Sequence, residues 1–267
     1  MSHLRPITAR RRLELTDGDA RPPRGAPSGS TLDDDLREQV ARIAKLQRVF
    51  YADARFALLI VLQGRDAAGK DGTIRHVFSA VNPQGCEVAS FKQPTDLEQR
   101  HDYLWRVHQR VPARGMIGIF NRSHYEDVLV ERVRHLAPKA EWEQRYRQIN
   151  DFERMLTENH VVILKFFLHV SRAEQKRRLR DRLTDETKNW KFSAGDLEDR
   201  ARWGGYTRAY RDALRRCSTP WAPWYLVPSD DKRVRNWLVA GVIVRALEGL
   251  KLRYPKGDPT ILRLKIR

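Results

Sequence analysis

Residues 64–71 have the types and spacing of a phosphate-binding loop. They read Gly-Arg-Asp-Ala-Ala-Gly-Lys-Asp and directly follow the apolar run 57–62. Glycines let the backbone curl until its N–H groups converge on phosphate oxygens, the next helix presents its positive N-terminus, and Lys70 adds a mobile cation. The pattern predicts that the protein binds a polyphosphate group. Apart from Asp66 and Lys70, the residues expected to contact it are Gly64, Arg65, Ala67, Ala68, Gly69, Asp71, Gly72 and Thr73.

The loop carries two carboxylates that bear on metal binding. Asp71 stands where a Ser or Thr hydroxyl usually contacts magnesium, and Asp66 lies inside the loop beside Arg65. A carboxylate so close to bound phosphates would repel them unless a divalent cation lay between. Asp66 is therefore the first candidate ligand for Mg²⁺, or for Mn²⁺ in its place. The alternative is that Asp66 only hydrogen-bonds loop amides, as Asp often does in turns.

A second polar cluster, residues 121–127, follows a predicted strand over 116–120. It reads Asn-Arg-Ser-His-Tyr-Glu-Asp and lies at the carboxyl edge of the sheet, where ligands bind in open α/β folds. Arg122 can bridge phosphates with its planar fork, while Glu126 and Asp127 can hold magnesium directly or through water. Two acids that open a helix also interact favourably with the helix dipole, and this explanation stays open.

Strand and helix patterns alternate along the chain and must position these two clusters. Five apolar runs are predicted to be strands: residues 57–63, 86–91, 116–120, 161–168 and 224–227. Helical patterns lie between them, which implies a parallel sheet with helices on both faces. An apolar helical stripe before the first strand has Thr31 or Asp33 as its cap, and a last helix begins near Asp231.

The composition points to an anionic partner. The chain has 51 Lys plus Arg against 34 Asp plus Glu, a net charge of +17, so DNA, RNA, acidic membranes and inorganic polyphosphate all qualify, as does a merely solvated basic surface. No apolar stretch approaches the roughly 20 residues that span a bilayer, and no secretory signal is seen, so we expect a cytoplasmic protein without a membrane partner. Cys86 and Cys217 support neither a disulfide framework nor a zinc site.

Three regions are expected along the chain. Residues 1–30 contain an arginine triplet at 10–12 and a Pro/Gly/Ser-rich stretch, which predict a basic arm that is flexible or loosely docked. Residues 31–255 are long enough for one domain with one substantial core. Residues 256–267 form a C-terminal tail.

Residues 64–72, 121–127 and 188–197 together resemble the polyphosphate kinase 2 family, and the resemblance covers roughly residues 32–255. It implies a three-layer α/β/α P-loop kinase fold of the thymidylate-kinase type, with a parallel central sheet and a helical lid. It also implies magnesium-dependent phosphoryl transfer between inorganic polyphosphate and AMP, ADP or ATP, in a homo-oligomer that we expect to be a tetramer.

The resemblance assigns roles to single residues. Asp66 and Lys70 act within the loop, and Arg122 with Glu126 or Asp127 completes the magnesium and nucleotide site. The four catalytic candidates are Asp66, Lys70, Arg122 and Asp127, of which Asp66 and Asp127 hold the metal. Asn121 resembles the class III members that accept AMP as well as ADP, whereas members restricted to diphosphates tend to carry Asp there.

Residues 176–182 are a basic helical segment that follows the strand 161–168. Arg178 and Arg182 share one helical face, and with Lys188 and Lys191 they could close over a phosphate chain and exclude water. The lid would span about residues 176–210. A solvent-facing basic helix would give the same pattern.

The expected reaction is in-line attack by a terminal phosphate oxygen of AMP or ADP on the end phosphorus of polyphosphate, without a covalent enzyme intermediate. The attacking oxygen is already anionic, so no strong general base is needed, and the reaction should be reversible. Guanine nucleotides stay open as further acceptors. One alternative is an ATP-dependent nucleoside monophosphate kinase; another is a non-catalytic anion- or nucleic-acid-binding P-loop protein, although no recognisable nucleic-acid motif is present.

Overall fold

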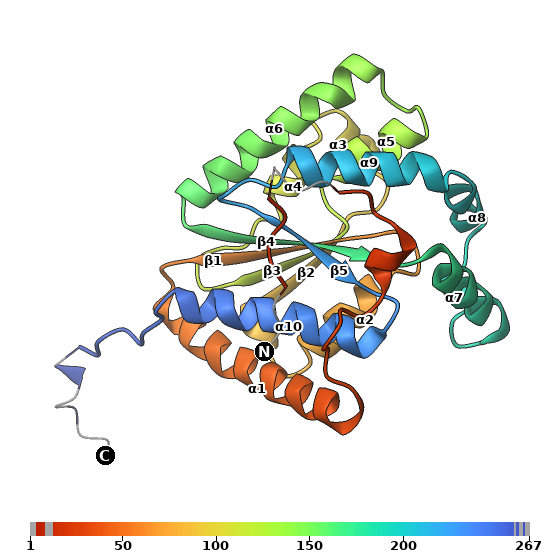
Figure 1. Ribbon diagram of the computed structural model, residues 1–267. Helices are drawn as coiled ribbons and strands as arrows, with labels where there is room; N and C mark the ends of the chain where they lie inside the picture. Colours follow the sequence, from red (N-terminus) through yellow and green to blue (C-terminus); the bar gives the residue numbers. More distant parts are fainter. Residues whose placement is uncertain (1–3, 9–12, 259, 262–263, 265–267) are drawn as a thin grey trace.

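The computed structural model describes residues 4–8, 13–258, 260–261 and 264 (Figure 1). Within these ranges, five parallel strands form one central sheet in the order β2-β3-β1-β4-β5. The strands are β1 (Ala57–Gln63), β2 (Cys86–Ser90), β3 (Ile117–Asn121), β4 (Val161–His169) and β5 (Trp224–Pro228). The five predicted strands are confirmed, and their bounds move by one residue at most.

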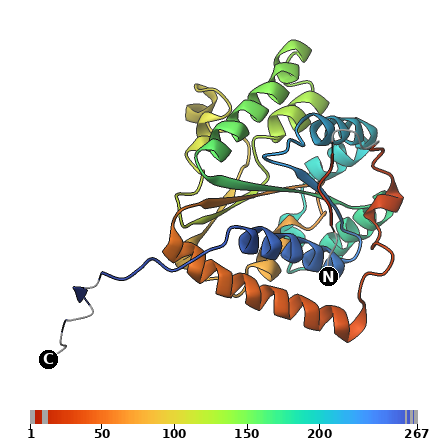
Figure 2. The ribbon, with the colours of Figure 1, turned by 60° about the vertical axis from the view of Figure 1, so that its left-hand side comes forward.

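Helices cover both faces of the sheet (Figures 1 and 2). One face carries α1 (Gly29–Asp53), α2 (Lys70–Val77) and α10 (Lys232–Gly249). The other carries α5 (Glu126–Val133), α6 (Lys139–Glu158) and α9 (Trp203–Arg216), with the short α3 (Asp96–Gln99) and α4 (Trp105–His108). Beyond the carboxyl ends of the strands lie α7 (Arg172–Thr184), η3 (Asn189–Lys191) and α8 (Ala194–Ala201). Two more 3₁₀ turns are η1 (Asp17–Ala20) and η2 (Pro83–Gly85). The predicted three-layer α/β fold is confirmed.

The central strand β1 is buried along its whole length, which explains its unbroken apolar sequence. Successive side chains of a strand point to opposite faces. Leu59 and Val61 accordingly belong to the core beneath α5, α6 and α9, whereas Leu58, Ile60 and Leu62 belong to the core beneath α1 and α10. The strand that carries the phosphate-binding loop is therefore held by apolar packing from both sides.

Two helices that cover the same face of the sheet, α1 and α10, begin after polar residues. α10 begins after Asp231, as predicted, and the Asp231 carboxylate accepts hydrogen bonds from the N–H groups of Arg233 and Val234. α1 begins earlier than predicted, with Ser28 as its N-cap in place of Thr31 or Asp33. The two helices run side by side across the face (Figure 2).

Part of the predicted N-terminal arm packs onto the domain, the docked form of the two that its composition left open. Ile7, Leu13 and Leu15 are buried, and Ile7 N donates to Trp224 O on the edge strand β5 at 2.8 Å. The arm docks because its few apolar side chains find a surface along β5 and α9, which composition alone could not reveal. The arginine triplet 10–12 lies outside the described residues.

The C-terminal region leaves the domain after α10 (Figure 1). Residues 253–258 are exposed. Within the described ranges, none of the helices is both long and apolar enough to cross a membrane.

The docked arm should contribute measurably to stability. Leu13→Ala removes a side chain that is 4% exposed, and we expect the free energy of unfolding to fall by about 2–5 kcal/mol, measured by urea denaturation. The matched control is Leu136→Ala, at a position that is 66% exposed, where a change within about 0.5 kcal/mol is expected. Equal, small effects of both substitutions would contradict the docking.

Candidate active site

The phosphate-binding loop joins the end of β1 to the start of α2, and one glycine is essential to its shape. Gly69 has φ +107°, a backbone conformation that disfavours other residues. A Cβ atom at Gly69 would also lie only 1.8 Å from Nη1 of Arg235. Both constraints explain why a glycine stands immediately before Lys70.

Two buried arginines support the loop from behind. Arg178 Nη1 donates to Ala67 O at 3.0 Å and to Ala68 O at 3.2 Å, and Arg235 Nη1 donates to Ala68 O at 3.3 Å. The carbonyl oxygens of Ala67 and Ala68 are thus hydrogen-bonded to arginines. Burial, with a smaller contribution from the Arg178 charge, lowers the pKa of Arg235 to about 10.

Lys70, the first residue of α2, is buried and turned back over the loop. Its Nζ donates to Gly64 O at 2.7 Å and to Arg65 O at 3.4 Å. Burial, and then the nearby charge of Arg122, lowers the pKa of Lys70 to about 8. The ammonium group is thus held where the loop curves, the place that a phosphate-binding lysine occupies.

Arg122 links the second cluster to the phosphate-binding loop. Its Nη2 donates to Asp66 Oδ1 at 2.8 Å, and its Nη1 donates to Glu126 Oε2 at 3.4 Å. The Glu126 charge, and also that of Asp66, raises the pKa of Arg122 against the opposing effect of burial. These three residues and Gly64 line a small pocket of about 30 Å³, here called the loop pocket. The predicted convergence of the two motifs is therefore present in the structure.

Asp71 forms a second link between the motifs. Its Oδ1 accepts from Asn121 Nδ2 at 2.8 Å, and its Oδ2 accepts from Lys191 Nζ at 3.3 Å. Burial would raise the pKa of Asp71, but these two hydrogen bonds outweigh it and the pKa is lowered. The residue that replaces the usual Ser or Thr therefore connects α2 to the end of β3 and to η3.

Sequence reasoning missed the part of the site that α9 supplies. Arg65 lies over the ring of Trp203, 4.0 Å from its centroid, and donates to Thr207 Oγ1 at 2.6 Å. Tyr206 and Tyr210 line the loop pocket from the same helix. Arg65 and Thr207 are 142 residues apart in sequence, so no local pattern predicts their contact. The sequence indicates only that Trp203, Thr207 and Tyr210, three or four residues apart, lie on one face of α9.

The predicted lid cations have separate roles in the structure. Arg178 is buried beneath the loop, whereas Arg182 donates to Asp196 Oδ2 at 3.2 Å and Lys188 pairs with Asp185. Lys191 alone among the four reaches a side chain of the phosphate-binding segment, through Asp71. Gln175, which was not predicted, donates from Nε2 to Asp66 O at 3.0 Å.

Asp127 is not in the loop pocket. It lines a neighbouring pocket of about 700 Å³, here called the large pocket, which is walled by α3, α4, α5 and α6. Its Oδ2 is buried and has no hydrogen-bond partner among the described residues, while its Oδ1 lies 3.7 Å from Arg145 Nη1. Burial, and then the charge of Glu131, raises the pKa of Asp127 to about 7.

Mg²⁺ fits the donors at this sheet edge, although not as one preformed cage. In the part of the chain that the structure describes, no three His, Cys, Asp or Glu side chains converge. Mg²⁺ keeps several waters and commonly uses one or two carboxylates plus substrate phosphates. Asp66 and Glu126 lie together at the loop pocket, whereas Asp127 lines the adjacent large pocket and keeps one buried carboxylate oxygen without a partner among the described residues. The joint role of Asp66 and Asp127 stays a prediction.

Comparison with known proteins places this geometry in a family. The family model described as Polyphosphate kinase 2 (PPK2) matches residues 28–255. The chain belongs to the polyphosphate kinase 2 family. The family that the sequence motifs suggested is thereby confirmed, over nearly the same residues.

Individual members of the polyphosphate kinase 2 family are similar along most of the chain. The AMP/ADP-polyphosphate phosphotransferase of Meiothermus ruber is 55% identical over 217 residues, which cover 81% of each chain. The ADP-polyphosphate phosphotransferase of Rhodopseudomonas palustris is 47% identical over 236 residues, 84% of this chain and 82% of that one. The crystal structure of Polyphosphate Kinase 2 from Arthrobacter aurescens TC1 matches with a TM-score of 0.89 and 42% identity, covering 97% of this chain and 93% of that one.

The loop geometry predicts a large effect of a single methyl group. In Gly69→Ala, the new Cβ collides with Arg235 and the backbone loses its left-handed conformation, so the loop amides should move. We expect polyphosphate-dependent nucleotide phosphorylation to fall roughly 100-fold, measured as product formed per enzyme. Gly257→Ala is the control, since nothing lies near its Cβ position. Equal activity of both variants would contradict this account of the loop.

Proposed function

We propose that the protein is a polyphosphate:nucleotide phosphotransferase, which transfers the terminal phosphate of inorganic polyphosphate to ADP and AMP and makes ATP and ADP. The observation that carries the proposal is the junction of Lys70, Asp66 and Arg122 at one sheet edge, in a chain of the polyphosphate kinase 2 family. Both relatives described above are named for polyphosphate, which favours this donor over ATP and disfavours an ordinary monophosphate kinase.

The two pockets suggest where each substrate binds. The loop pocket is lined by Arg65 and Arg122 together with the carboxylates of Asp66, Glu126 and Asp199, which suits the end of a phosphate chain bound with a divalent cation. The large pocket has the volume of a small-molecule site, and Tyr103, His101 and Arg106 are among its walls, which suits a nucleoside monophosphate or diphosphate. Glu126 lines one pocket and Asp127 the other, so a phosphate would transfer across the first turn of α5.

In the proposed reaction, the chain positions the reactants and neutralises charge. Arg122 and Lys70 would donate to oxygens of the transferring phosphate, and Lys191 would add positive charge from the lid side. Bound Mg²⁺, held by Asp66 with Glu126 or Asp127, would offset the remaining negative charge of the phosphates. The reaction is reversible because both sides conserve a phosphoanhydride bond.

Two features support AMP as well as ADP as acceptors. Asn121 carries the amide that the family's class III members have at this position, and the relative from Meiothermus ruber is named for both nucleotides.

The net charge of the chain, +17, suits a polyanionic donor such as polyphosphate. We also propose a cytoplasmic homotetramer, for which size-exclusion chromatography with light scattering is the direct test.

The first experiment supplies polyphosphate and magnesium with AMP or ADP in separate reactions, without ATP. ADP formed from AMP and ATP formed from ADP are expected, and chelation of the metal should abolish both. Activity on ADP alone would restrict the acceptor to diphosphates. Faster transfer from ATP than from polyphosphate would instead identify a monophosphate kinase.

Two substitutions test the site itself. Lys70→Ala and Asp66→Asn should each lower the rate by roughly 100-fold or more, because each removes a charge that faces the transferring phosphate. Lys45→Ala, on the exposed face of α1, is the control and should leave the rate unchanged. Wild-type rates in the first two variants would refute the site.

A further inference from the structure

Three consecutive side chains of the second cluster point into the core. Ser123, His124 and Tyr125 are 0%, 1% and 0% exposed, whereas the residues on either side of them, Arg122 and Glu126, line the loop pocket. The segment that presents Arg122 is thus anchored from beneath by three polar residues.

The first anchor joins this segment to the phosphate-binding loop. Gln63, the last residue of β1, donates from Nε2 to Ser123 Oγ at 3.1 Å, and the N–H of Tyr125 donates to the same oxygen at 3.2 Å. Gln63 directly precedes Gly64 and is itself buried. A displacement of Ser123 would therefore also displace Gln63 and, next to it, the first residue of the phosphate-binding loop.

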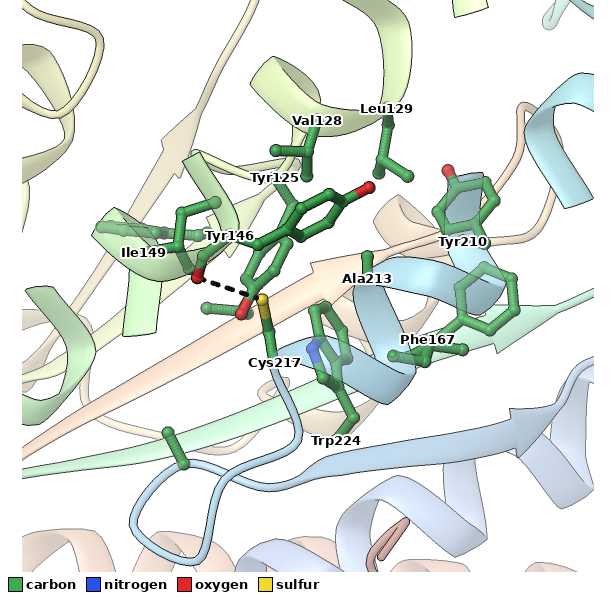
Figure 3. Packing of buried hydrophobic residues seen from close by; sticks show 14 of the residues in the cluster. Tyr125, Val128, Leu129, Tyr146, Ile149, Phe167, Tyr210, Ala213, Cys217 and Trp224 are labelled. Carbon is green, nitrogen blue, oxygen red and sulfur yellow. Dashed lines mark hydrogen bonds between the residues drawn. The ribbon is translucent and has the colours of Figure 1, made fainter. Parts of the chain in front are cut away.

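The second anchor is a buried network from three other elements. Tyr125 OH donates to Glu153 Oε1 on α6 at 2.9 Å, and Lys165 Nζ on β4 donates to Tyr125 OH at 2.8 Å. Lys165 also forms an ion pair with Glu153 and donates to Cys217 O at 2.7 Å. His124 Nε2 lies 3.2 Å from Glu153 Oε1. Figure 3 shows Tyr125 enclosed by apolar side chains of this core, with Trp224 and Cys217 beside it.

The cost of burying these charges indicates a role other than stability. Lys165 and Glu153 are at most 1% exposed, and a buried ion pair is often no more stabilising than well-packed apolar residues of similar volume. What such a pair supplies is a defined geometry, because each partner must keep the other and its hydrogen bonds. Burial would raise the pKa of Glu153, but the Lys165 charge and the His124 contact outweigh it and the pKa is lowered, so the carboxylate stays ionised.

The backbone of Arg122 needs this anchorage. Its φ is +63°, a left-handed conformation that is uncommon for residues other than glycine and persists only where the surroundings enforce it. The same conformation directs the guanidinium to Asp66 and Glu126. We propose that Tyr125, Glu153 and Lys165 are positioning residues for phosphoryl transfer, which hold the backbone of residues 121–127 so that Arg122 stays between Asp66 and Glu126.

The inference rests on the proposed role of Arg122, and a double-mutant cycle tests the two separately. Tyr125→Phe removes only the hydroxyl at the centre of the network and keeps the ring. We expect kcat to fall about tenfold, with KM for polyphosphate within about twofold, because the substrate-binding groups stay in place while Arg122 loses its alignment. In an Arg122→Lys background, where the two-pronged fork is already lost, the same substitution should change kcat by less than about twofold.

The matched control is Tyr146→Phe. Tyr146 is equally buried in the same apolar cluster, but its hydroxyl accepts from Arg132 Nη1 at 3.1 Å and has no bond to residues 121–127. This variant should leave kcat unchanged in both backgrounds. Thermal melts of all variants show whether they are folded, and Ser123→Ala replaces Tyr125→Phe in the cycle if that variant does not fold.

Each outcome decides between distinct explanations. An unchanged kcat in Tyr125→Phe, or an equal loss in both backgrounds, would overturn the positioning role. A wild-type kcat in Arg122→Lys would instead refute the proposed role of Arg122. A loss that is seen only when Arg122 is present supports the inference.

Discussion

The parallel pairing of β1 with β3 is the constraint on which the candidate site depends. Leu62 of β1 lies opposite Asn121 of β3, so the phosphate-binding loop and the second polar cluster leave the sheet side by side. No long or flexible connection is then needed for Arg122 to reach Asp66. The pairing itself is secured by apolar side chains of β1 that alternate between two cores. A fully buried central strand is thus both the stabilising centre of the fold and the support of its chemistry.

Three buried cations, Arg178, Arg235 and Lys165, contribute to this site by fixing the protein around it. Arg178 and Arg235 donate to loop carbonyl oxygens, and Lys165 donates to Cys217 O, to Tyr125 of the second cluster and to Glu153 beneath it. Each is placed behind the surface that would meet phosphate. The exposed basic residues can attract a polyanion at long range, but the buried ones determine the shape that it meets. The net charge of the chain therefore combines two physical roles.

The two pockets divide the site at the first turn of α5. Glu126 and Asp127 are adjacent in sequence, yet one shares Arg122 with Asp66 and the other faces the large pocket with Glu131 and Arg145. Adjacent helical residues point about 100° apart, which is why a single turn can serve both. A donor held by the loop and an acceptor in the large pocket would meet at this turn.

The local elements and the motifs could be predicted from the sequence. The apolar runs gave the strands, glycine spacing gave the loop, and the order of three motifs gave the family, because these signals depend on neighbours within a few residues. Which distant side chains complete the site became clear from the fold. It put Trp203 over Arg65, turned Arg178 under the loop, separated Asp127 from Asp66 and docked the N-terminal arm on β5. Such contacts join residues far apart in sequence, and they follow from the packing of whole elements, which residue type and spacing do not encode locally.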